Sequence, residues 1–85
     1  MKEKLTGMIN QMVQSYRDDA NYDHVAYKSN GITGITEAAW VLKVRMSGAN
    51  VKATIIDAVV NATKDTADLD AVISIAADTM IAMQS

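Results

Sequence analysis

The side chains best suited to chemistry or recognition are concentrated in residues 16–30. This segment holds all three tyrosines and the only histidine of the chain, together with basic and amide side chains. Aromatic rings beside cations and amides stack on a nucleobase or anchor a protein partner at small entropic cost. The residues predicted to bind a ligand or partner are therefore Tyr16, Arg17, Tyr22, His24, Tyr27, Lys28 and Asn30.

A structural role for the same residues is the alternative. Tyr16 completes the apolar stripe of the first predicted helix, and Tyr27 can lie at the edge of the core. Tyrosine at a core boundary is common, because its ring is apolar and its hydroxyl is polar. In this interpretation the rest of the segment is a solvated connector.

The sequence contains few residues that could form a catalytic or metal site. A single histidine excludes a multi-histidine metal site within one chain, and the absence of cysteine excludes disulfides and thiolate zinc sites. Carboxylates that suit magnesium occur at Asp18, Asp19 and Asp23 and at Asp65, Asp68 and Asp70. Both groups stand where predicted helices begin, so capping explains them. We therefore predict no enzyme, no catalytic residue, no metal and no cofactor.

The charge balance argues against nucleic acid and membranes as partners. Eight basic and ten acidic residues give a net charge of −2, and the basic residues form no cluster that would neutralise a phosphate backbone. No apolar run is long enough for a bilayer span or a secretory signal. The absence of cysteine also fits a reducing compartment, so we expect a cytoplasmic protein.

The chain length of 85 residues predicts a single domain, 1–85, with a small core. Helical periodicity is clear in three segments, 2–18, 49–64 and 67–84. The first carries its apolar stripe at Leu5, Met8, Ile9, Met12, Val13 and Tyr16. Ser47-Gly48 is expected to break the chain before the second segment, and Thr66 to cap the third.

The last segment is apolar on nearly every side, which more than one neighbour must cover. Either this helix lies centrally in the core, or it contacts another subunit. Oligomerisation is a common way for small cores to gain buried area. The predicted homo-oligomer interface is Leu69, Val72, Ile73, Ala76, Met80 and Met83.

The middle of the chain leaves two folds open. Residues 38–46 alternate apolar and polar side chains as a strand does, and Asn30-Gly31 is a strong hairpin signal. Thr36-Glu37-Ala38-Ala39 instead resembles a helix start, and 22–28 can form a short helix. We predict an all-α compact bundle of four to five short helices that associates into an oligomer. The alternative is an α+β fold with a small antiparallel hairpin from residues 23–46 packed on helices.

The expected function is stoichiometric protein–protein binding by a small non-enzymatic protein, as an inhibitor or adaptor. Accessory proteins of phages and mobile elements provide an analogy of size and type. A receptor or sponge for a nucleotide-like ligand is the alternative, with stacking on Tyr22 or Tyr27 and with Arg17 and Lys28 at the phosphates. A weaker alternative is a DNA-binding regulator that uses residues 36–64 as a helix-turn-helix.

Overall fold

The computed structural model describes residues 1–84, and all the regular structure in that range is helical. The helices are α1 (Lys2–Met12), α2 (Gln14–Asp18), α3 (Ala20–Ser29), α4 (Glu37–Gly48), α5 (Ala53–Thr63) and α6 (Leu69–Gln84). The all-α prediction is confirmed, and the α+β alternative is wrong for these residues. None of these helices is long and apolar enough to cross a membrane.

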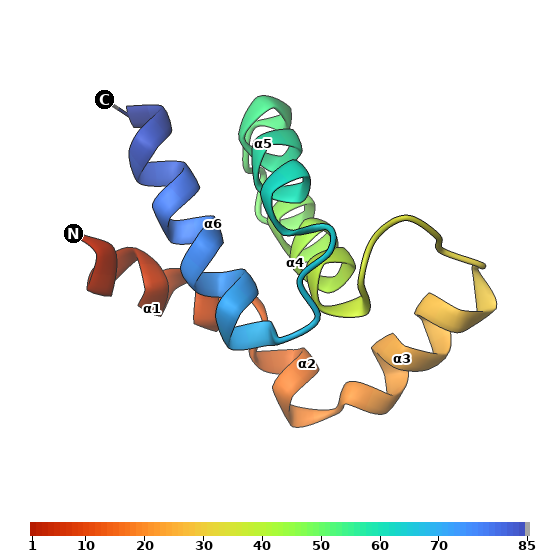
Figure 1. Cartoon of the computed structure of the whole chain (residues 1–85). Helices are drawn as coiled ribbons and strands as arrows, with labels where there is room; N and C mark the ends of the chain where they lie inside the picture. The colour runs from red at the N-terminus through yellow and green to blue at the C-terminus, as the bar shows by residue number, and fades with distance from the viewer. Residues whose placement is uncertain (85) are drawn as a thin grey trace.

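Helix α6 occupies the middle of the bundle (Figure 1). It packs against α1 on one side and α5 on the other, and α4 lies beside α5. Helix α3 lies at the opposite end of the molecule from both termini and reaches α4 through the loop of residues 30–36. The core therefore joins α1, α4, α5 and α6, while α3 stands at its edge.

The central position of α6 corrects the predicted oligomer interface. Val72, Ile73 and Ala76 are at most 1% exposed and Met80 is 8% exposed, because α1, α4 and α5 cover them within one chain. A second copy cannot reach these four side chains in this fold. Leu69 is partly buried against the same core, and only Met83 is clearly exposed. The central-core alternative describes this helix.

The first predicted helix is present but divided. Most of its stripe packs against the core, with Ile9 and Val13 fully buried, but Met8 is 50% exposed. The helix is interrupted at Val13, where φ is −101° and ψ is 9°. The Val13 N–H still donates to the Ile9 carbonyl, and the Val13 carbonyl accepts from the Arg17 N–H. The extended backbone of Asp19, at φ −148° and ψ 81°, then separates α2 from α3. These interruptions raise the number of helices above the four to five predicted.

The middle third is helical because its apolar residues satisfy both periods. Ala38, Leu42 and Met46 alternate as in a strand, but they are also four residues apart and line the buried side of α4. The Thr36 hydroxyl accepts a hydrogen bond from the Ala39 N–H, which is the predicted cap. Asn30-Gly31 ends α3 with Gly31 at φ 60° and forms no hairpin.

The other predicted helix boundaries need correction. Helix α4 includes Ser47-Gly48, and the break follows at residues 49–52, where Asn50 adopts φ 61°. Asp68, not Thr66, caps α6, since its carboxylate accepts a hydrogen bond from the Ala71 N–H. The Thr66 carbonyl instead accepts from the Thr36 hydroxyl, which ties the start of α4 to the α5–α6 loop.

Candidate functional site

A buried ion pair fastens the inner face of α3 to α4. Asp23, 3% exposed, accepts two hydrogen bonds of 2.9 Å from the Arg45 guanidinium. The Arg45 Nε donates to the Ser15 hydroxyl at 3.2 Å. Because one guanidinium of α4 hydrogen-bonds to both α2 and α3, it fixes the position of α3 as well as its rotation.

The Glu37 carboxylate makes the second attachment. Its Oε2 accepts from the Tyr16 hydroxyl at 2.8 Å, and its Oε1 lies 2.6 Å from His24 Nδ1, the nitrogen that donates to it. Burial raises the pKa of Tyr16 to about 12, and the hydrogen bond with Glu37 and the charges of Glu37 and Asp23 act in the same direction. The phenol is therefore a proton donor at neutral pH, which suits a structural contact and not a nucleophile.

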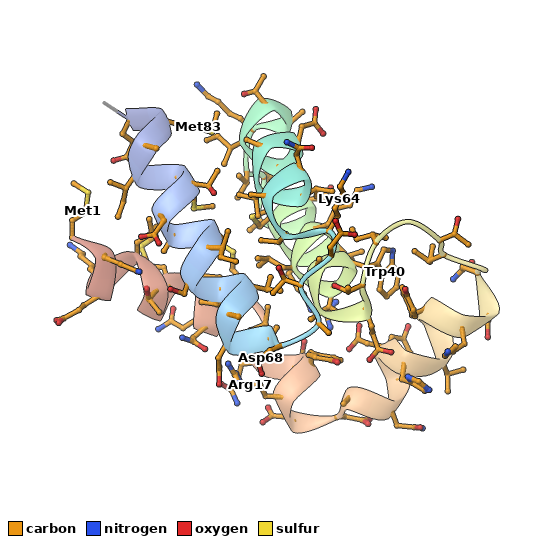
Figure 2. All side chains as sticks on the ribbon, in the orientation of Figure 1. Met1, Arg17, Trp40, Lys64, Asp68 and Met83 are labelled. Atoms are coloured by element: carbon orange, nitrogen blue, oxygen red, sulfur yellow. The ribbon has the colours of Figure 1, made fainter. Side chains whose placement is uncertain are left out.

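Tyr27 and Asn30 also serve the fold. The Tyr27 hydroxyl donates to the Ile35 carbonyl, and its ring lies against Trp40 with centroids 5.7 Å apart and planes tilted by 55°. Figure 2 shows Trp40 at the start of α4, beside the loop that leads from α3. The Asn30 amide donates to the Ala26 carbonyl. These contacts hold the loop of residues 30–36 to both helices.

Arg17 is turned away from this cluster. Its guanidinium donates to Asp70 at 2.6 Å and to Asn10 at 3.0 Å, which joins α2 to α1 and to the first turn of α6. Lys28 is exposed near the end of α3. The structure therefore brings Tyr16 and His24 together on Glu37, but it does not gather the seven predicted residues into one site.

The outer face of α3 is the part of the predicted segment that faces solvent. We use this name for Tyr22, Val25 and Ala26 with the adjoining Asp19 and Asn21, which together line one shallow hollow. Tyr22 is 74% exposed and Val25 is 52% exposed. Tyr22 and Asp19 also border a second hollow, whose other lining residues are Ser15, Asp23 and Arg45.

Sequence reasoning missed the residues that hold α3 in place. Asp23 was predicted to cap a helix, and Arg45 and Glu37 were not singled out. An acidic and a basic residue 22 positions apart give no periodic signal that they will pair. The one available hint was the lone arginine among the apolar residues of 38–46, since a charge in such a segment needs a partner when buried.

Three of the six carboxylates considered for magnesium have roles in the fold. Asp23 pairs with Arg45, Asp68 caps α6 and Asp70 pairs with Arg17. Across residues 1–84, no three histidine or acidic side chains lie close enough together to hold a metal ion.

A second exposed apolar surface lies where the first turns of α1 meet the end of α6. Met1, 82% exposed, and Met8, 50% exposed, line a hollow there with Lys4, Leu5 and Gln84. Met83, which the sequence assigned to the oligomer interface, is 45% exposed at the same end of α6. Figure 2 shows Met1 and Met83 at the end of the molecule opposite α3. We refer to Met1, Leu5 and Met8 as the methionine surface.

Comparisons with known proteins give no further assignment. No protein-family model, curated protein or solved structure matches this chain. The geometry of its own residues therefore carries the functional argument.

Proposed function

We propose that this chain is a small, non-enzymatic cytoplasmic protein that binds another protein stoichiometrically, as an inhibitor or adaptor, through the outer face of α3. The observation that carries the proposal is Tyr22, 74% exposed on a helix whose opposite face is fastened by a buried ion pair. Tyrosine is among the residues that most often dominate binding energy at protein interfaces.

Folding does not account for the apolar side chains on this face. Tyr22 and Val25 lie one helical turn apart and leave most of their surface in water. The contacts of Arg45 and Glu37 hold the helix beneath them without using either side chain. A partner would meet apolar anchors that are already positioned, which reduces the entropy lost on association.

The contacts favour a protein over a nucleotide-like ligand. The proposed phosphate ligand Arg17 is engaged by Asp70, and the proposed stacking residue Tyr27 is engaged by Trp40. Tyr22 remains available for stacking, but Asp19 lines the hollow beside it. A carboxylate there repels phosphate groups, so the ligand chemistry expected at Tyr22 is apolar or cationic.

Self-association would need a surface other than the predicted face of α6. The methionine surface and Met83 are the exposed apolar groups at the chain ends, and methionine side chains adapt readily to a partner's shape. We expect the mass in solution, measured by light scattering at high concentration, to exceed the 9.2 kDa of one chain. Met8→Asp should return the measured mass to that of one chain. A monomer at all concentrations would overturn self-association and leave the role of α3 intact.

Site-specific photocrosslinking tests the proposed binding face. A benzophenone amino acid replaces Tyr22 in the full chain, and the matched control places it at Asn61, an exposed position on α5. We expect irradiation in the producing cells to give an adduct of one defined mass from position 22 and none from position 61. No adduct from position 22, or the same adduct from both positions, would refute the proposal.

A further inference from the structure

Asp19 stands next to Tyr22 with a carboxylate that the fold does not use. It occupies the N-cap position of α3, but its side chain makes no capping hydrogen bond. Aspartate at this position ordinarily accepts from a backbone N–H of the first turn. Within residues 1–84 Asp19 also forms no ion pair, in contrast to Asp23, Asp70 and Asp78. Its charge therefore remains exposed beside an exposed aromatic ring.

The two hollows that meet at Tyr22 share Asp19 but differ in their other charged residues. The hollow lined by Asp19, Asn21, Val25 and Ala26 contains no basic residue. The other hollow contains the Arg45 guanidinium and the Asp23 carboxylate, whose charges offset each other as an ion pair, so Asp19 is the unpaired charge in both hollows. In the first hollow a positively charged side chain can approach Asp19 without meeting a guanidinium, and Asn21 offers an additional amide oxygen.

We propose that this hollow seats an arginine side chain of the protein partner. The guanidinium stacks on the Tyr22 ring and forms an ion pair with Asp19, and an adjacent apolar side chain of the partner contacts Val25 and Ala26. Arginine fits better than lysine because its planar group stacks on an aromatic face while its N–H groups donate to a carboxylate.

This inference rests on the proposed function and names the partner's chemistry. A blocked Leu-Arg-Leu tripeptide serves as the probe, and the same peptide with citrulline in place of arginine is the matched neutral control. We expect NMR titration of the full chain to show saturable amide shifts at residues 19–26. The arginine peptide should bind roughly fivefold more tightly than the citrulline peptide, as expected for an exposed cation–π contact with an ion pair.

Variants of Asp19 and Tyr22 separate the contribution of the carboxylate from that of the aromatic ring. Asp19→Asn keeps an efficient N-cap residue, so α3 stays folded while the carboxylate charge is lost. We expect it to remove the preference for arginine over citrulline, and Tyr22→Ala to weaken binding of both peptides. Asp57→Asn, an exposed aspartate on α5, should leave the titration unchanged.

Three results would each overturn the proposed arginine site. They are equal binding of the two peptides, an unchanged preference in Asp19→Asn, and the absence of shifts at residues 19–26. If photocrosslinking at position 22 still traps a partner in those cases, the binding function survives without it. If no adduct forms either, both proposals fail.

Discussion

Helices α6 and α3 are held in the bundle by different forces. Helix α6 is held by burial, with Val72, Ile73, Ala76 and Ala77 at most 1% exposed among three other helices. The only buried residue of α3 is Asp23. This helix is held mainly by the Asp23–Arg45 pair and the His24–Glu37 contact, with the ring of Tyr27 against Trp40 as its apolar contact. The more apolar helix is therefore the one whose apolar surface is covered within its own chain.

The proposed interaction surface therefore lies on the less apolar of the two helices. An apolar face that is covered inside one chain has no surface left for a partner, however apolar its sequence. Helix α3 has few apolar residues, and directional polar bonds on its inner side leave Tyr22 and Val25 outside. In this fold, exposed apolar residues on a helix that polar contacts hold in place are therefore the better indication of a binding surface.

The largest expected effect belongs to the core. Leu42→Ala removes a fully buried side chain of α4. We expect it to lower the free energy of unfolding by about 3 kcal/mol, since both the transfer energy and the new cavity count against the fold. Urea denaturation followed by circular dichroism measures the loss, and a change below about 1 kcal/mol would mean that the core repacks around the site.

Breaking the Asp23–Arg45 ion pair that holds α3 is expected to have the next largest effect. Arg45→Met leaves the Asp23 carboxylate buried without a partner and should cost about 2 to 3 kcal/mol, limited by the ability of α3 to detach locally. The matched control is Arg17→Met, which breaks a pair whose acidic side chain is 80% exposed and should cost less than about 0.5 kcal/mol. Equal losses in urea denaturation would show that the buried pair has no special role.

The value of the sequence for prediction differs between these two regions. Thr36 as a cap and the stripe through Ile9 and Val13 follow from local spacing, so they are predictable. The Asp23–Arg45 pair depends on tertiary proximity, which no local pattern encodes. The apolar face of α6 was visible, but whether its own chain or another copy covers it depends on how α1, α4 and α5 are arranged.

Alkaline pH should weaken the contact between Tyr16 and Glu37. Folding raises the pKa of Tyr16 from 10.0 to about 12, so the contact contributes its full stability below pH 10 and loses it as the pH rises through about 12. Tyr16→Phe should cost about 1 kcal/mol at neutral pH. The difference between the two proteins in urea denaturation should shrink above pH 10, and a constant difference would contradict the assignment.

The smallest effect on stability is expected at the outer face of α3. Tyr22→Ala removes a side chain that is 74% exposed, so unfolding should change by less than about 0.5 kcal/mol. Thermal unfolding of the purified variant measures this change. A loss above about 1 kcal/mol would mean that Tyr22 belongs to the fold, and its exposure would no longer indicate a partner.

Burial holds α6 in place whereas mainly polar contacts hold α3, and native-state hydrogen exchange measures this difference for each helix. We expect the amides of residues 72–80 to exchange only through global unfolding, and those of residues 22–29 through local opening of lower free energy. Exchange of both helices at the same free energy would contradict the claim, because α3 would then be as much a part of the core as α6.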